Sequence, residues 1–440
     1  MSIKPLLSRF DLTMIVVSLV IGMGIFRTPA DVAIKAGSEW VFYGAWIFGG
    51  VVSLCGALTF AEIGARYPHA GGFYKTLSHC YHPSVAFMAE WVLAISNIAS
   101  VAAVAMIGAG YINPVLMPDS LQNDTGIKIT TITSVLVLYV VNYLGIKTSA
   151  RLQNALTLFK IGMIILLCMA VFVHDAPPPV ATYKPYEGSL ISAFGLSLIP
   201  VFFTYTGYAL TINMGGDIAQ PQRNIPRSIF TGIGIVLALY LAANFAYCRV
   251  LGFGGVQQTD VLAARMAQVL FGSVGYKVTS ILMFLSVLAY VNVYIMSNPR
   301  VYYAMAEDGV LPPIFRRVNP RTQVQEFGIT VFVAAILVTL FFADSFGSLL
   351  NYTMFFNTTG LILGASAIFV LRKRDDGQEG IYKVRPYPIV PLIFIAAYAY
   401  VTICIVADDP AASYVYGAAF AIGLAIYYLC IRIWGNKPQS

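Results

Sequence analysis

The stretch Ile21-Gly22-Met23-Gly24-Ile25-Phe26 lies in the middle of the first long apolar run of this chain. Glycine weakens a helix because its backbone loses more freedom on folding than that of any other residue. A second polar and glycine-containing stretch, Phe203-Thr204-Tyr205-Thr206-Gly207-Tyr208, follows Pro200 in the sixth apolar run. We therefore predict two helices that are each interrupted near the middle.

The composition indicates that these helices cross a membrane. Of the 440 residues, 58% are hydrophobic and 11% are charged, whereas a soluble domain carries about a quarter charged residues. The mean hydropathy is +0.75, which excludes a water-soluble enzyme and a disordered chain. About 20 apolar residues span a bilayer. An all-α integral membrane protein with twelve transmembrane helices is predicted, at residues 10–36, 39–65, 84–114, 127–146, 151–174, 189–219, 226–251, 270–306, 327–343, 347–372, 387–407 and 411–434.

The distribution of Lys and Arg predicts the orientation. With the N-terminus inside the cell, 19 of the 27 Lys and Arg residues fall on the inner side, 7 on the outer side and one within a span. Inner loops of membrane proteins are enriched in these residues. We expect a single transporter domain over residues 1–440, multi-pass in the plasma membrane, with both termini in the cytoplasm.

The two interruptions predict a binding site. Small residues also let helices pack closely, which is the alternative interpretation of either interruption alone. Interrupted helices at matching positions of two halves point to a transporter site, with residues 10–174 and 189–372 as inverted repeats and 387–434 as two appended helices. Unwound backbone can bind the ammonium and carboxylate groups of an amino acid. The predicted substrate-binding residues are Val20, Ile21, Gly22, Met23, Gly24, Ile25, Phe203, Thr204, Tyr205, Thr206 and Tyr208.

Lys160 is a charged residue within the fifth predicted span. A lysine at the centre of a bilayer costs about 2.5–3.5 kcal/mol on insertion scales, so it is a functional candidate. Its position about 12 Å from the inner end of the span also allows snorkelling toward the cytoplasm. Glu62 and Glu90 lie near the ends of apolar runs, and we expect them at the membrane interface.

Several strings resemble the amino acid–polyamine–organocation (APC) superfamily, and within it the L-type amino acid transporter (LAT) family in its bacterial form. This resemblance implies a LeuT-type fold of five plus five helices, with helices 1 and 6 interrupted and with alternating access by rocking of spans 1, 2, 6 and 7. The strings are Ile21-Gly22-Met23-Gly24-Ile25-Phe26, Ala61-Glu62-Ile63-Gly64, Tyr67-Pro68-His69-Ala70-Gly71-Gly72, Gln220-Pro221-Gln222-Arg223-Asn224-Ile225-Pro226-Arg227, Arg300-Val301-Tyr302-Tyr303-Ala304-Met305-Ala306-Glu307-Asp308-Gly309 and Lys383-Val384-Arg385-Pro386.

The resemblance also bears on coupling and specificity. Similar transporters carry a lysine in the fifth helix, beside the first interruption, where sodium-coupled relatives hold an ion. Lys160 is expected to replace that ion, and the segment from Phe284 to Ser297 lacks the adjacent Thr–Ser pair of the sodium site. The family usually has serine at the position of Met23 and glycine at that of Thr206. This chain therefore differs from the family at two positions that are expected to lie next to the substrate. Asn292 would face helix 1.

The predicted function is secondary transport of neutral L-amino acids, independent of sodium, by exchange or by proton-linked uptake. A cationic amino acid or polyamine permease is an alternative, but it needs a carboxylate at the site, and the interrupted segments have none before Asp217. A membrane sensor on the same fold would need a soluble tail, and only residues 435–440 follow the last span.

Other classes of ligand and partner are not expected. The four histidines and six cysteines show no metal-ligand spacing and no disulfide framework, so neither metal nor cofactor is predicted. The excess of positive charge is assigned to inner loops facing membrane lipid, with no nucleic acid involved. The resemblance implies that a covalent heavy subunit would attach through a cysteine after span 3. The segment from Val115 to Gly126 contains no cysteine, which favours a prokaryotic protein without that subunit.

Overall fold

The computed structural model describes residues 5–172, 184–259, 262–342, 346–374, 380–408 and 411–434. The end of the predicted fifth span and the last six residues lie outside this part. Within it the regular structure is helical, with two isolated bridges, Leu7 to Ile218 and Ala70 to Met214, and no sheet. The α-helices are α1 (Arg9–Val20), α2 (Gly24–Ala36), α3 (Glu39–Arg66), α4 (Gly72–Cys80), α5 (Pro83–Leu116), α6 (Asp124–Tyr143), α7 (Ile146–Ala170), α8 (Leu190–Tyr205), α9 (Pro221–Gln257), α10 (Leu262–Glu307), α11 (Glu326–Phe342), α12 (Phe346–Arg374), α13 (Ile389–Asp408) and α14 (Ala411–Trp434).

Four short 3₁₀ helices complete the regular structure: η1 (Asp119–Leu121), η2 (Tyr208–Asn213), η3 (Gly215–Asp217) and η4 (Pro313–Arg316). Both interruptions occur where the glycines predict them. The first separates α1 from α2, and the second separates α8 from η2. Gly207 has φ +112°, and a Cβ there would collide with the carbonyl oxygen of Leu19, so this position requires glycine.

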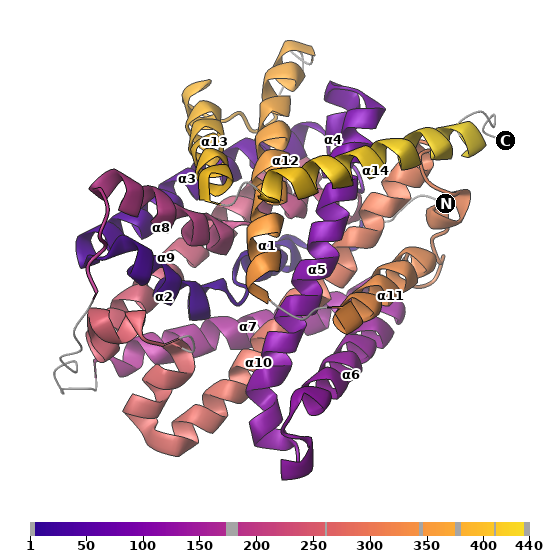
Figure 1. Ribbon diagram of the computed structural model, residues 1–440. Helices are drawn as coiled ribbons and strands as arrows, with labels where there is room; N and C mark the ends of the chain where they lie inside the picture. Colours follow the sequence, from indigo (N-terminus) through magenta and orange to yellow (C-terminus); the bar gives the residue numbers. More distant parts are fainter. Residues whose placement is uncertain are drawn as a thin grey trace.

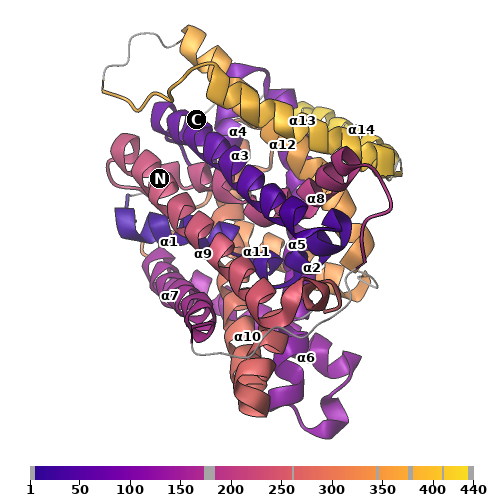
Figure 2. The same cartoon turned by 90° about the vertical axis from the view of Figure 1, so that its left-hand side faces the viewer.

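The helices α2 and α8 lie together on the left-hand side of the bundle in Figure 1. α1 packs against α9 and α7, while α2 packs against α8. α10 packs against both α5 and α7, and α3 and α9 run side by side along one flank (Figure 2). The side chains of α1 from Leu12 to Val20 are all buried. The unwound backbone is therefore surrounded by protein, which is the only setting in which irregular backbone is tolerated at membrane depth.

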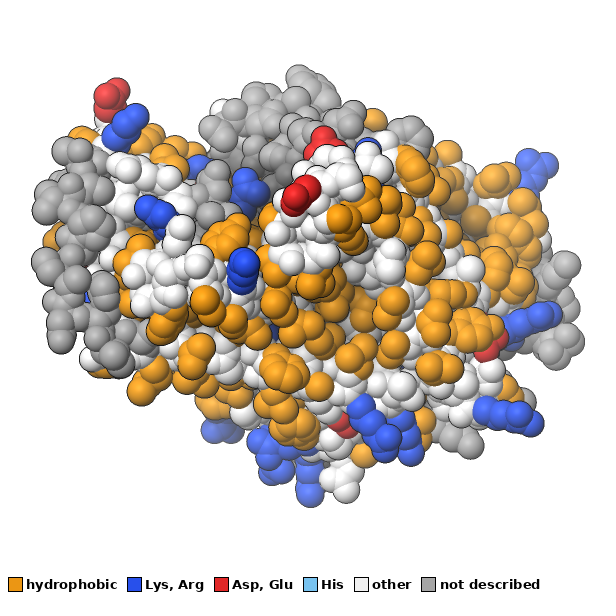
Figure 3. Space-filling view, turned by 90° about the horizontal axis from the view of Figure 1, so that it is seen from below, with side chains coloured by type: hydrophobic (Ala, Val, Ile, Leu, Met, Phe, Trp, Pro, Cys, Tyr) orange, Lys and Arg blue, Asp and Glu red, His pale blue; other side chains and the backbone are white. Residues whose placement is uncertain are grey.

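Eleven helical segments among the described residues are long and apolar enough to cross a membrane, with each interrupted helix counted once. The apolar helix α11 is shorter, so the total of twelve spans and the inverted repeat stay predictions. α9 and α10 extend beyond the predicted spans because each continues through a kink, at Gly252 and Gly272. Figure 3 shows hydrophobic side chains over the middle of one face and most Lys and Arg toward its margins, as a lipid-facing surface requires.

Both glutamates are buried inside the protein, and their placement at the membrane interface stays a prediction. Glu62 is fully buried, and its carboxylate accepts hydrogen bonds from Arg66 at 2.8 Å, from Arg372 at 2.7 Å and from the Val384 backbone N–H at 2.6 Å. These three donors compensate the cost of burying the charge. Glu90 on α5 is 5% exposed.

Asn292 also lies elsewhere than expected. Its side chain on α10 donates to Gln153 at 2.8 Å and accepts from Asn142 at 2.7 Å. Ser149 donates to Asn142 at 2.6 Å. Asn292 therefore connects α10 to α6 and α7, and its hydrogen bonds are made there instead of with α1.

Candidate functional site

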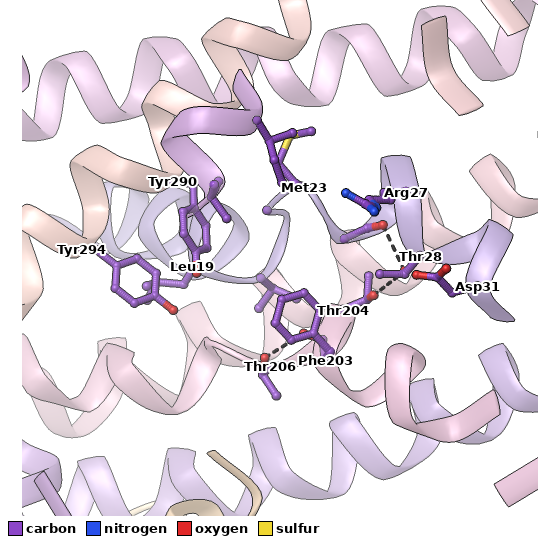
Figure 4. A pocket seen from close by; sticks show the side chains of 15 residues that line it. Leu19, Met23, Arg27, Thr28, Asp31, Phe203, Thr204, Thr206, Tyr290 and Tyr294 are labelled. Atoms are coloured by element: carbon purple, nitrogen blue, oxygen red, sulfur yellow. Dashed lines mark hydrogen bonds between the residues drawn. The ribbon is translucent and has the colours of Figure 1, made fainter. Parts of the chain in front are cut away.

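A cavity of about 210 Å³ lies between the two interruptions (Figure 4). It is smaller than the roughly 300–1,000 Å³ of pockets for drug-sized ligands, so it suits one small molecule. Its lining comes mainly from α1, α2, α5, α8 and α10. The lining residues are Leu19, Val20, Gly22, Met23, Gly24, Arg27, Thr28, Asp31, Val104, Ile107, Phe203, Thr204, Thr206, Tyr290 and Tyr294.

Most of the predicted binding residues meet at this cavity. Those that line it are Val20, Gly22, Met23, Gly24, Phe203, Thr204 and Thr206. Ile21 contributes its backbone carbonyl to the interruption and buries its side chain. Ile25, Tyr205 and Tyr208 are buried in helix packing and do not line the cavity. The hydroxyl of Tyr205, for example, lies 3.5 Å from the carbonyl oxygen of Trp46 on α3.

The first turn of α2 faces the cavity through Gly24. Met23 at the N-cap makes no side-chain cap hydrogen bond, while the N–H of Phe26 donates to the Met23 carbonyl at 3.1 Å. A helix N-terminus carries a partial positive charge. A Cβ on Gly24 would lie 2.8 Å from Cγ2 of Thr204, which shows how closely α2 approaches α8 here. The first interruption thus presents the uncapped N-terminus of α2 at a narrow point.

Side chains from distant helices satisfy the carbonyl groups of the first interruption. The Lys160 ammonium on α7 donates to the Ile21 carbonyl and lies 3.5 Å from the Ser18 hydroxyl. Lys160 is 1% exposed, and no described carboxylate lies within ion-pair distance of it. The hydroxyl of Tyr240 on α9 is 2.9 Å from the Val20 carbonyl and 3.1 Å from the Thr204 carbonyl. Because a hydroxyl has one proton, Tyr240 can donate to only one of them at a time.

Two threonine hydroxyls at the second interruption donate to carbonyl groups of α8. The Thr206 hydroxyl donates to the Phe203 carbonyl at 2.7 Å, and the Thr204 hydroxyl donates to the Pro200 carbonyl at 2.8 Å. Thr204 also meets Thr28 of α2, with 2.6 Å between the hydroxyl oxygens. The contact between Thr28 and Thr204 links α2 to α8 across the cavity wall.

Beyond the second interruption a buried ion pair fixes the chain to α10. Nε of Arg300 lies 2.5 Å from one carboxylate oxygen of Asp217, and Nη2 lies 3.2 Å from the other. Both side chains are buried. Arg300 also donates to the Met296 carbonyl. The bidentate geometry is typical of strong Arg–carboxylate pairs.

A second cavity of about 40 Å³ adjoins the first. Four residues line both: Phe203, Thr206, Tyr290 and Tyr294. The smaller cavity extends to Asn97 and Ser100 of α5, where Ser100 lies within 3.0 Å of the Tyr290 hydroxyl. Thr206 is therefore one of the four residues that lie between the two spaces.

The sequence did not single out the cavity residues of α5 and α10, nor Arg27 and Asp31 of α2. Tyr290 and Tyr294 stand four residues apart in an apolar run, and nothing distinguishes them from lipid-facing tyrosines of the same chain. The ring of Tyr290 packs on the first interruption, because a Cβ on Gly22 would lie 3.1 Å from it. The positions of Arg27 and Asp31 could have been predicted to share one face of the helix, because opposite charges four residues apart lie on the same side.

A cavity between two interrupted helices of a multi-spanning membrane protein defines the class of secondary transporters. The chain belongs to the amino acid permease family, which it matches over residues 7–435. It is therefore a membrane transport protein of the APC superfamily and not an enzyme.

Curated relatives cover nearly the whole chain. It is 30% identical over 427 residues to the serine/threonine exchanger SteT of Bacillus subtilis, covering 95% of each protein. It is 27% identical over 438 residues to the human cystine/glutamate transporter, covering 97% of this chain and 85% of that one. It is 24% identical over 433 residues to the human large neutral amino acids transporter small subunit 2, with coverage of 97% and 80%.

Proposed function

We propose that this permease carries small neutral L-amino acids by alternating access, without sodium, as an exchanger or by proton-linked uptake. The observation that carries this proposal is the combination of an N-terminus of α2 that no side chain caps with a buried ammonium on the carbonyl of Ile21. The N-terminus of α2 suits a substrate carboxylate. The Lys160 ammonium places a positive charge next to the first interruption.

The substrate is held as a zwitterion. Its carboxylate binds the N–H groups at the N-terminus of α2, where the helix dipole favours negative charge. Its ammonium binds backbone carbonyl groups of the second interruption, which ends α8 at Tyr205. Gly22 and Gly24 line the cavity and allow the substrate to reach the backbone.

The size of the cavity favours small side chains. A single water molecule takes about 30 Å³ in the liquid, so about 210 Å³ accommodates a small amino acid. Thr206 is one of the residues that lie between this space and the smaller cavity. Alanine, serine and cysteine should compete better than phenylalanine or tryptophan. The relative named as a serine/threonine exchanger supports small substrates.

Sodium independence rests on Lys160. Its ammonium donates to the backbone of the first interruption and supplies there the positive charge that an ion would otherwise bring. Because no described carboxylate pairs with it, loss of its proton would leave no unpaired anion behind. Lys160 can therefore serve a purely structural role in exchange or a titrating role in proton-linked uptake.

A permease for cationic amino acids or polyamines is the second candidate. Asp31 lines the cavity and supplies the carboxylate that such a substrate needs. Arg27 lines the same cavity from the preceding turn of α2 and offsets that charge, so neutral substrates remain favoured.

The setting of the protein belongs to the same proposal. The Lys and Arg distribution supports a plasma membrane location with both termini in the cytoplasm. The absence of cysteine from Val115 to Gly126 supports function without a covalently attached subunit, in a prokaryotic cell.

Uptake of labelled amino acids into liposomes tests the proposal. Purified protein is placed in vesicles that are empty or loaded with unlabelled amino acid, with and without sodium and a pH gradient. We expect uptake of labelled alanine or serine that does not change with sodium. An exchanger will need amino acid inside the vesicle, whereas proton-linked uptake will rise in empty vesicles with an inward proton gradient. Failure of every neutral amino acid to enter would contradict the proposal.

A further inference from the structure

Two opposite charges line one end of the central cavity. Arg27 and Asp31 both belong to α2 and both contribute to the cavity wall. Figure 4 shows them with Thr28 on one side of the pocket, while Tyr290 and Tyr294 lie on the opposite side. Arg27 stands three residues and Asp31 seven residues beyond Gly24, which places them about 4.5 Å and about 10.5 Å further along the helix axis.

This end of the cavity leads away from α1. With the N-terminus in the cytoplasm, α2 runs from the interruption toward the outside, so a substrate that enters from outside passes the two charged residues before it reaches Gly24. Both side chains are partly exposed, as expected for residues at the mouth of a cavity. Each charge acts on a nearby ion more strongly than in bulk water, because the effective dielectric constant at a protein wall is lower.

We propose that Arg27 and Asp31 form a charge filter at the outer end of the cavity, which admits zwitterionic amino acids and discriminates against amino acids with a net charge. The inference rests on the proposed function, since it assigns the specificity of the same site. A zwitterion presents one group of each sign and is attracted by both residues. A substrate with an additional charge brings that charge close to a residue of the same sign.

A role in helix stability alone would not explain the position of the pair. Opposite charges one turn apart stabilise a helix in any exposed location, including faces that do not touch a cavity. Lys35 lies one further turn along α2 and does not line the cavity. The same helix therefore contains a matched cation outside the site, which serves as the control.

Competition by charged amino acids tests the filter. Inhibition of labelled alanine uptake by lysine and by glutamate is measured for the unmutated protein, Arg27→Gln and Asp31→Asn. Arg27→Gln removes the positive charge and keeps that of Asp31, so lysine should inhibit about tenfold more strongly and glutamate less strongly. Asp31→Asn should give the opposite pattern, and the double variant should show weak discrimination of both signs. Raising the ionic strength should reduce these differences, because salt screens exposed charges.

Control variants separate the filter from folding effects and from the proposed function. Arg27→Lys keeps the charge and should keep the pattern of the unmutated protein, as should Lys35→Gln. Equal lysine-to-glutamate inhibition ratios in the unmutated protein, Arg27→Gln and Asp31→Asn would overturn the filter while alanine uptake still supports the proposed function. If the unmutated protein transports no neutral amino acid, the proposed function is wrong, and the charge filter, which depends on it, is wrong as well. Asp31→Asn, which preserves shape, decides the case if Arg27→Gln does not fold.

Discussion

One buried cation lies beside the first interruption of this permease and another lies beyond the second, and the two cations differ in what they bind. Arg300 lies beyond the second interruption and pairs with the carboxylate of Asp217. Lys160 lies beside the first interruption and binds the uncharged carbonyl of Ile21 and the hydroxyl of Ser18. Arg300 is thus neutralised by a partner, whereas Lys160 leaves a net positive charge inside the protein.

This difference separates structure from function. A buried ion pair holds two elements together, and the removal of one partner leaves the other charge unpaired. An ammonium on a carbonyl can be lost, or can release its proton, without leaving an opposite charge behind. We therefore expect substitutions at Arg300 to act mainly on folding and substitutions at Lys160 to act mainly on transport.

The largest effect is expected at the ion pair. Arg300→Met leaves the fully buried Asp217 carboxylate without its cation and should lower the free energy of unfolding by about 3–5 kcal/mol. Thermal unfolding in detergent measures this. Arg300→Met combined with Asp217→Asn should recover much of the loss, because both charges are gone. The exposed Arg316 of η4 provides the control Arg316→Met. A single variant as stable as the unmutated protein would refute the structural role.

Lys160→Ala should abolish most transport while the protein still inserts and remains monodisperse. The substitution leaves the Ile21 carbonyl without its donor, and each buried unsatisfied acceptor costs about 1–3 kcal/mol. A loss of that size in the transport-competent conformation reduces the rate about tenfold or more. Labelled alanine exchange in liposomes measures it. Lys147→Ala, on the exposed end of the same helix, should transport normally. If uptake in empty vesicles rises with a proton gradient, Lys160→Ala should remove that dependence.

Tyr240→Phe tests the bridge between the interruptions. The substitution removes the one hydroxyl that reaches the carbonyls of both Val20 and Thr204. The free energy of unfolding should fall by about 1–3 kcal/mol, with slower exchange, because the two interruptions are no longer held together. Tyr247→Phe, two turns further along α9 and also buried, is the matched control. Equal melting temperatures and equal exchange rates for the two variants would show that the Tyr240 hydroxyl does not hold the two interruptions together.

The smallest effect is expected at Thr206 in the second interruption, whose hydroxyl donates to the nearby Phe203 carbonyl. Thr206→Gly removes a side chain that lines both cavities. The ratio of inhibition by phenylalanine to inhibition by alanine should therefore rise about tenfold, because one methylene in a hydrophobic pocket is worth about 1–3 kcal/mol. Thr206→Ser should give an intermediate ratio. Strong inhibition by tryptophan in the unmutated protein would show that Thr206 does not limit the pocket.

Local composition made the two interruptions predictable, whereas for Lys160 it left both burial and snorkelling toward the cytoplasm open. Glycines beside polar groups weaken a helix inside an apolar run, and two such stretches at matching positions point to a transporter site. A lysine in mid-span must find a polar partner or reach the surface. The hydrogen bond from Lys160 to Ile21 connects residues 139 positions apart, so only the resemblance to a family suggested that neighbour.

The remaining features depend on tertiary packing. Tyr290 and Tyr294 line the cavity because α10 crosses beside Gly22, and their sequence context is that of any apolar helix. The burial of Glu62 depends on Arg372 and on the N–H of Val384, more than 300 residues away. Asn292 turns to α6 and α7 because Asn142 and Gln153 offer it hydrogen bonds there. Local sequence patterns do not predict these contacts between residues that are far apart in the chain.

The initial rate of labelled alanine exchange, measured in sodium chloride and in choline chloride for the unmutated protein and for Lys160→Ala, tests the central claim most directly. The buried ammonium beside the first interruption should make the unmutated rate equal in the two salts. Lys160→Ala should be severely impaired in both. Stimulation of the unmutated protein by sodium, or full activity of Lys160→Ala, would contradict the claim that Lys160 supplies the charge of this site.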